Sequence, residues 1–295
     1  MDENVKQKRH MGMKLKNNIS NIIVYAILII VSIVWLVPFV FILLESFRVE
    51  SAMRVDYIIP QQWGFDNYIN LFTPTTERNF LRWYGNTLLV GLAVAILQTI
   101  IVLSMSYTLS RLRFKGRKLL MNFMLVLGMF PGFLTLILLY KVLADLGLTQ
   151  ENAPIGLILV YCASSGMGYY ISKGFFDTIP KSLDEAARVD GATRFQVFYK
   201  IIMPLAKPIV IYTILTAFMA PWGDFIFAKY IAHGEPTGYN VAVGLWSLMN
   251  SKVTKGDSYT LFCAGGVTVA TPVTILFLFL QKYYVEGVTG GAVKG

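Results

Sequence analysis

The sequence predicts an all-α, polytopic membrane protein with six transmembrane helices and both termini in the cytoplasm. Three observations lead to this prediction: a 55% share of hydrophobic residues with a mean hydropathy of +0.57, a charged share of only 15%, and six long apolar stretches. Soluble domains carry about 25% charged residues, so this surplus of apolar side chains needs a solvent other than water. The composition excludes a soluble two-domain enzyme and a disordered regulator.

Each apolar stretch reaches the roughly 20 residues that a helix needs to cross the hydrocarbon core of a bilayer. The stretches are residues 20–45, 83–110, 119–140, 152–172, 207–231 and 259–281. The first has no charge from Asn17 through Leu44 and no small-residue cleavage motif after it, which predicts an uncleaved span rather than a signal peptide. We therefore expect an N-terminal tail at 1–19, a transmembrane domain at 20–285 and a C-terminal tail at 286–295.

The basic residues predict the orientation, because Lys and Arg accumulate on the cytoplasmic side of a membrane. With six spans, 18 of the 26 Lys and Arg residues fall on the face that holds both termini. That face also holds a loop at 175–206, whereas the loop at 232–258 falls on the opposite, extracytoplasmic face. The net charge of +9 is then a signal of topology, so we expect no nucleic-acid partner. The expected location is a bacterial or archaeal plasma membrane.

The loop between the fourth and fifth spans predicts two short helices. Ser182 with Glu185, and Thr193 with Gln196, have the spacing of capping boxes at helix starts. Gly191 between them is suited to a left-handed helix stop. The first helix combines small side chains with carboxylates, so a partner's backbone could approach closely and its basic groups could pair across the interface. The alternative is a solvated connector whose acid only caps its own helix.

The same loop resembles the EAA motif of ABC-importer permeases, which reads EAA-x3-G-x9-I-x-L-P. The matching residues here are Glu185, Ala186, Ala187, Gly191, Ile201 and Pro204, and Met203 replaces the leucine. In that family the loop forms the coupling helix, which docks into a cleft of the cytoplasmic ATPase subunit. The resemblance implies that the residues coupled to the ATPase are Ser182, Asp184, Glu185, Ala186, Ala187, Asp190, Gly191 and Pro204.

Further segments resemble the carbohydrate-uptake branch of these importers, the MalG-like permeases. They lie at 60–68, 86–88, 110–116 and 281–295. The resemblance implies a translocation path shared with a second, MalF-like permease, two cytoplasmic ATPase subunits that bind ATP and Mg²⁺, and an extracytoplasmic sugar-binding protein that touches the 232–258 loop. It also implies maltodextrin-type oligosaccharides as substrate and a C-terminal tail that reaches between the ATPases. Since no G-x-x-x-x-G-K-[ST] loop occurs, we expect no cofactor on this chain and no enzymatic activity of its own.

Polar and aromatic side chains within the spans are candidates for the substrate path, because sugars bind to aromatic platforms and hydrogen-bonding groups. Apart from Glu45, the last residue of the first span, Asp224 is the only acid inside a predicted span, and acids there face a partner or a water-filled path. The candidates are Tyr161, Ser164, Ser165, Tyr212, Thr216, Trp222 and Asp224. The alternative is that Asp224 reaches headgroup water and that the others pack against neighbouring helices.

Two other functions compete with an ABC importer for carbohydrates. One is an ion-coupled secondary sugar carrier, and the other is an ABC-importer permease for another small solute. The 182–204 loop argues against a self-sufficient carrier, which needs no ATPase contact. An intramembrane serine protease lacks its base, because His10 and His233 both lie outside the spans. The two cysteines, Cys162 and Cys263, lie within apolar runs, and the sequence predicts no metal site.

Overall fold

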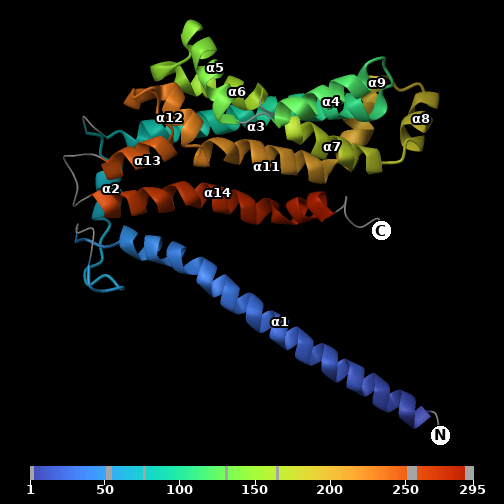
Figure 1. Ribbon diagram of the computed structural model, residues 1–295, viewed down its shortest axis with the longest axis horizontal. Helices are drawn as coiled ribbons and strands as arrows, with labels where there is room; N and C mark the ends of the chain where they lie inside the picture. The colour runs from blue at the N-terminus through green and yellow to red at the C-terminus, as the bar shows by residue number, and fades with distance from the viewer. Residues whose placement is uncertain are drawn as a thin grey trace.

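The computed structural model is built from helices, which confirms the predicted all-α class. It describes residues 3–50, 55–75, 78–129, 132–163, 166–250 and 258–289. Within these ranges the sole extended pairing is an isolated bridge between Arg48 and Trp63. Figure 1 shows a bundle of roughly parallel and antiparallel helices, with α8 (Ser182–Val189) at one end and α2 (Asp66–Phe72) at the other.

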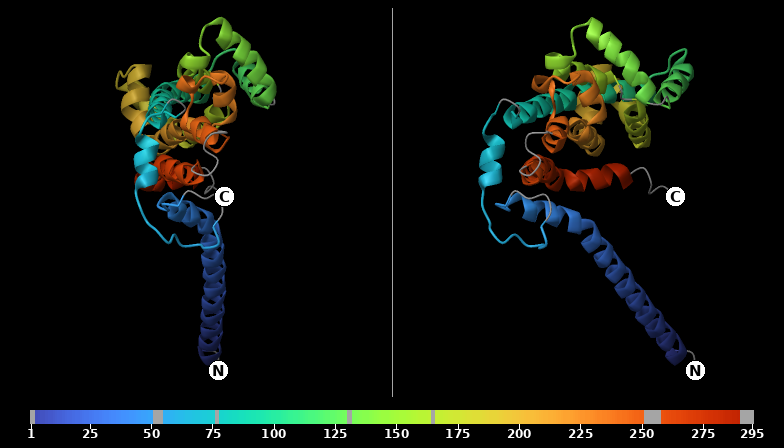
Figure 2. Two further views of the ribbon diagram at one scale, coloured as in Figure 1. Left: turned by 90° about the vertical axis from the view of Figure 1, so that its left-hand side faces the viewer. Right: turned by 60° about the vertical axis from the view of Figure 1, so that its left-hand side comes forward.

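The first helix, α1 (Glu3–Ser46), leaves the bundle along most of its length. Both views in Figure 2 show it projecting away from the other helices. The most apolar 18-residue stretch within Ser20–Ser46 has a mean hydropathy of 3.2, and none of that stretch is buried within the chain. The C-terminal end of α1 packs against α14 (Ser258–Thr289). Residues 3–19, expected as a separate tail, continue the same helix as the apolar part.

The bundle is organised around α3 (Phe80–Arg111), which packs against four later helices. Its main neighbours are α6 (Ala153–Ala163), α7 (Gly166–Thr178), α11 (Lys207–Gly223) and α13 (Val241–Asn250). The helix α14 packs on α11 and α13 from the other side. It runs on through Thr289, so the expected C-terminal tail begins inside this helix, and residues 290–295 lie outside the described ranges.

Three helices in the described ranges are long and apolar enough to cross a membrane on their own. These are Ser20–Ser46, Phe80–Arg111 and Tyr259–Lys282. Two bent pairs raise the number to five: Gln150–Ala163 with Gly166–Thr178, bent by 44°, and Arg194–Leu205 with Lys207–Gly223, bent by 84°. The predicted span at 119–140 is divided between α4 (Arg117–Gly128) and α5 (Gly132–Asp145). The count of six spans therefore stays a prediction.

The expected loop at 232–258 contains more structure than its polar composition suggests. After α12 (Ile226–Ala232) the chain forms a 3₁₀ turn, η3 (Pro236–Gly238), and then the apolar helix α13. The backbone of the η3 segment is held by side chains of α3: Arg82 Nε donates to Thr237 O at 3.0 Å, and Asn86 Nδ2 donates to Tyr239 O at 2.9 Å. Residues 251–257 lie outside the described ranges.

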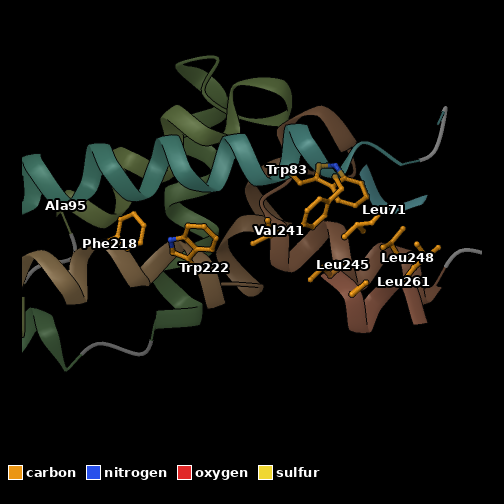
Figure 3. Packing of buried hydrophobic residues seen from close by; sticks show 11 residues of the cluster. Leu71, Trp83, Ala95, Phe218, Trp222, Val241, Leu245, Leu248 and Leu261 are labelled. Atoms are coloured by element: carbon orange, nitrogen blue, oxygen red, sulfur yellow. The ribbon is translucent and has the colours of Figure 1, made fainter. Parts of the chain in front are cut away.

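The core at this end of the bundle is a row of buried side chains from α3, α11, α13 and α14. Figure 3 shows Trp83 of α3 facing Val241 and Leu245 of α13. Gly244 of α13 permits this close approach, because a Cβ at that position would lie 2.1 Å from the indole ring of Trp83. Trp83 is 1% exposed and has little space to move.

Replacing Gly244 with alanine is expected to destabilise the fold by about 1–3 kcal/mol, the usual cost of overpacking a core. The matched control is Gly85→Ala in α3, where a Cβ would meet no atom within 4 Å and alanine favours the helix. The thermal unfolding midpoint of the detergent-solubilised protein should fall for Gly244→Ala and should not fall for Gly85→Ala. Equal midpoints for the two variants would contradict the packing argument.

Candidate coupling site and substrate path

The helix α8 is defined at both ends by local backbone geometry. Lys181 is its N-cap residue and makes no side-chain capping bond, so Ser182 is the first residue of the helix. The predicted Ser182–Glu185 capping box is therefore wrong, because the helix starts one residue too early for it. At the other end Gly191 has a φ of +83°, and Ala192 N donates to Ala187 O at 2.9 Å. This is the left-handed stop that the sequence predicts.

The two sides of α8 differ in exposure. Ser182, Glu185, Ala186 and Val189 are all exposed, and their i, i+3, i+4, i+7 spacing places them on one side of the helix. We call these four residues the outward face. Ala187 points the other way and is buried at 8% exposure, in a cluster with Leu103 of α3 and Phe176 of α7. The two alanines of the motif thus have separate roles, one outward and one inward.

Val189 is a residue that sequence reasoning missed. Its side chain is 88% exposed, although valine is apolar. The signal was present in the sequence, because Val189 follows Ser182 by seven residues and therefore lies on the same face. Asp190 and Gly191, which follow it, are exposed as well. The end of α8 therefore presents an uncovered apolar side chain beside small and acidic residues.

Asp184, one of the predicted coupling residues, does not lie on the outward face. Its carboxylate forms an ion pair with Arg111, the last residue of α3, with Nε and Oδ2 3.1 Å apart. The two side chains are 15% and 3% exposed, respectively. The pKa of Asp184 is raised above its ordinary value, because the effect of burial is larger than the opposing effect of the Arg111 guanidinium. Asp184 thus belongs to the contact between α8 and the bundle.

A groove of about 440 Å³ lies between the end of α3 and the helices α8 and α9 (Arg194–Gln196). It is lined by Tyr107, Arg111, Leu112, Arg113, Lys181, Asp184, Glu185, Arg188, Arg194 and Val197. Five of these residues are cationic and two are anionic, so the groove is positively charged. The sequence had drawn attention to the acids of this loop, but the basic residues set the sign of the groove.

The second half of the loop turns the chain back into the bundle. Thr193 and Gln196 form the predicted capping box, with Thr193 N donating to Gln196 Oε1 at 2.8 Å. A π-helical turn over Val197–Ile202 follows, and Pro204 lies in the short helix Met203–Leu205. The bend of 84° then leads into α11. Pro204 thus lies next to the corner, and it neither contacts the groove nor belongs to the outward face of α8.

Two of the predicted substrate-path residues meet each other. Tyr161 of α6 donates its hydroxyl to Asp224 Oδ2 at 2.5 Å, and Phe227 N donates to Asp224 Oδ1 at 3.1 Å. Asp224 lies between α11 and α12, and its backbone carbonyl accepts a hydrogen bond from Asn240, just before α13. Its carboxylate thus has two hydrogen-bond donors, Tyr161 of α6 and Phe227 of α12.

The remaining candidates are dispersed. Trp222 is 6% exposed and packs edge-on against Tyr84, in the core cluster shown in Figure 3; among the described residues its indole N–H has no acceptor. Thr216 lines an apolar cavity of about 330 Å³ with Leu215, Met219, Ala220 and Phe277. Tyr212 packs with the cluster around Ile209. Ser164 and Ser165 lie outside the described residues. Among the described candidates the structure therefore joins Tyr161 to Asp224.

Comparison with known proteins gives concordant matches over most of the chain. The family described as binding-protein-dependent transport system inner membrane component matches residues 100–289. The chain is 35% identical to the maltodextrin transport system permease protein MdxG of Bacillus subtilis (strain 168), covering 94% of this chain and 97% of that protein. It is 34% identical to the galactooligosaccharides transport system permease protein GanQ of the same organism, covering 96% of this chain and 99% of that protein.

A third relative and a solved structure extend these matches. The maltodextrin transport system permease protein MalD of Streptococcus pneumoniae (strain ATCC BAA-255 / R6) is 36% identical, over 96% of this chain and 99% of that protein. A bacterial ABC transporter that imports the acidic polysaccharide alginate contains a chain with the same fold, with a TM-score of 0.77 and 23% identity over 91% of this chain and 98% of that chain.

Proposed function

Since this chain belongs to the family of binding-protein-dependent transport system inner membrane components, we propose that it is one of two permease subunits of an ATP-driven importer for oligosaccharides. As an inner membrane component with several apolar helices, it is a multi-pass protein of the plasma membrane. The transported sugar is of the maltodextrin type. The supporting observation for the sugar is the similarity to the maltodextrin permease proteins MdxG and MalD, which match nearly the whole chain.

The proposed topology has six spans with both termini in the cytoplasm. Figure 1 supports it, because the N-terminal part of α1 and the C-terminal part of α14 both extend toward the end of the bundle that holds α8. An even number of crossings produces this arrangement. The third span would consist of α4 and α5 together, and α2, η3 and α13 would then lie on the extracytoplasmic side.

The outward face of α8 is the observation that supports coupling to ATPase subunits. A short helix that seats one alanine in the bundle and leaves Glu185, Ala186 and Val189 exposed offers a partner both close backbone approach and apolar contact. We assign ATPase contact to Ser182, Glu185, Ala186, Val189 and Asp190, with Gly191 shaping the end of the helix. Two cytoplasmic ATPase subunits bind ATP and Mg²⁺ in this proposal, and this chain hydrolyses nothing.

The other partners contact other surfaces. The segment around η3 and α13, at the far end of α3, is the proposed contact for the extracytoplasmic sugar-binding protein. The apolar length of α1 is uncovered within this chain, and it needs lipid or a second membrane subunit against it. We propose a MalF-like permease there, with the translocation path between the two subunits. Tyr161 and Asp224 are the two path residues that the structure joins.

Sugar uptake into proteoliposomes tests this function. The chain would be co-produced with the permease, ATPase and binding protein encoded beside its gene, and uptake of maltotriose, galactotriose and arabinotriose would be measured with and without ATP inside. We expect ATP-dependent, binding-protein-dependent uptake of maltotriose at the highest rate. Uptake driven by an ion gradient without ATPase subunits would indicate a secondary carrier, and a preference for galactotriose would overturn the maltodextrin assignment.

A further inference from the structure

The ion pair between Arg111 and Asp184 joins α8 to a helix that crosses the whole bundle. Arg111 is the last residue of α3, and α8 begins 71 residues later in the chain. The basic residues Arg113 and Lys115, two and four residues further on, are exposed, yet the Arg111 side chain is 3% exposed. Removing a guanidinium from water costs several kcal/mol, so a buried arginine needs partners that compensate its charge. Its partners therefore indicate what it does.

Arg111 contacts both sides of the turn that leads into α8. Its Nη2 donates to the Ile179 carbonyl at 2.9 Å, before the helix, and its Nε lies 3.1 Å from Asp184 Oδ2, within the helix. One planar side chain thus spans the turn from 179 to 184. A lysine here would have a single ammonium group, which could not contact the Ile179 carbonyl and Asp184 from two separate nitrogen atoms as the guanidinium does.

The neighbouring residue fixes the same end of α3 to α7. Ser110 Oγ donates to Asp177 Oδ1 at 2.5 Å, and Lys173 Nζ lies 2.5 Å from Asp177 Oδ2. Burial pushes the pKa of Asp177 up, but the hydrogen bonds from Lys173 and Ser110 outweigh it and hold that pKa below its ordinary value. Asp177 therefore stays ionised near neutral pH and keeps α7 on α3. Arg111 provides a polar contact between α3 and the turn that follows α7.

We propose that Arg111 is a positioning residue that fastens α8 to α3, so that a displacement of α8 moves α3 instead of being absorbed in the turn at 179–184. This inference rests on the proposed function, in which α8 is displaced by an ATPase subunit. Ala187 seats α8 against Leu103 and Phe176 through apolar contact alone, which permits sliding. Arg111 adds a hydrogen bond to the Ile179 carbonyl and an ion pair with Asp184. The hydrogen bond gives the contact a defined direction, because its strength depends on geometry.

Replacing Arg111 with glutamine tests this role in the complete complex in proteoliposomes. The uptake of maltotriose per ATP hydrolysed should fall by about tenfold, within the range typical of coupling between sites, while ATP hydrolysis per assembled complex is retained. Hydrogen exchange of the amides in 182–189 should become faster. The control is Arg113→Gln, which removes the same charge from an exposed residue of the same groove and should leave the uptake ratio and the exchange within twofold of the unmodified complex.

An unchanged ratio of uptake to hydrolysis in Arg111→Gln would overturn the proposal, as would a matching fall in Arg113→Gln. If Arg111→Gln does not assemble, Arg111→Lys is used instead, because it keeps the positive charge and removes the guanidinium. The ratio of maltotriose uptake to ATP hydrolysis must fall in that variant for the proposal to stand. Failure of the proposed function has a different signature, because the unmodified complex would then show no ATP-driven uptake of maltotriose at all.

Discussion

Replacing Gly191 with valine is expected to abolish sugar uptake and to uncouple ATP hydrolysis from transport, while insertion into the membrane is unaffected. Gly191 has a φ of +83° and ends α8. The left-handed conformation costs other residues about 1–2 kcal/mol, and a β-branched side chain is a strong outlier there. Because a Cβ at this position would meet no atom within 4 Å, the effect would come from the backbone and not from a clash.

The measurement compares Gly191→Val with Gly191→Asn in proteoliposomes, at equal amounts of assembled complex. Asparagine adopts positive φ far more readily than valine, so Gly191→Asn should retain most of the uptake. The outcome that would sink the assignment of α8 as the coupling helix is normal uptake in the valine variant. Similar losses in both variants would instead indicate that the added side chain itself obstructs a partner.

Replacing Val189 with aspartate should release the ATPase subunit from the permease. The side chain is 88% exposed in this chain, so the free permease should keep its unfolding midpoint. In the docked complex a carboxylate would enter an apolar contact without a partner, which is expected to cost more than about 2 kcal/mol, or roughly 30-fold in affinity. Co-purification of the ATPase subunit on the tagged permease measures this directly.

Val189→Thr is the matched control, because threonine has nearly the shape of valine and carries no charge. It should retain the ATPase subunit within a fewfold of the unmodified chain. Undiminished co-purification with Val189→Asp would show that the outward face of α8 is not the docking surface. A lowered unfolding midpoint of the free permease would show that Val189 supports the fold instead.

Local rules predicted the 182–204 loop well where the determinants are neighbours in the chain. Gly191 and the Thr193–Gln196 capping box lie within six residues of one another, and both are confirmed. The capping box at Ser182 failed for an equally local reason, since the turn at Pro180–Lys181 already starts the helix. The inward position of Asp184 could not be predicted, because its partner Arg111 lies 73 residues earlier and the two meet only in the folded bundle.

Prediction of the membrane spans from local sequence has the same limit. Apolar length alone identified α1, α3 and α14. It joined α4 and α5 into one stretch, because composition does not register where helical geometry is interrupted. Composition understated the structure at α13, where the glycines, the lysines and Pro236 around it suggested a polar loop. Its residues Val241, Val243, Leu245 and Leu248 are nevertheless buried. The Tyr161–Asp224 contact likewise needed two distant segments to meet.

The helix α3 is fastened at both of its ends to segments that come much later in the chain. At 32 residues it is about 48 Å long, with Arg82 and Asn86 bonded to the η3 segment at one end and Arg111 bonded to α8 at the other. A rod fixed in this way transmits force in both directions. By thermodynamic reciprocity, if ATP binding inside changes the affinity for the sugar-loaded binding protein outside, then arrival of that protein must change the affinity for ATP by the same factor.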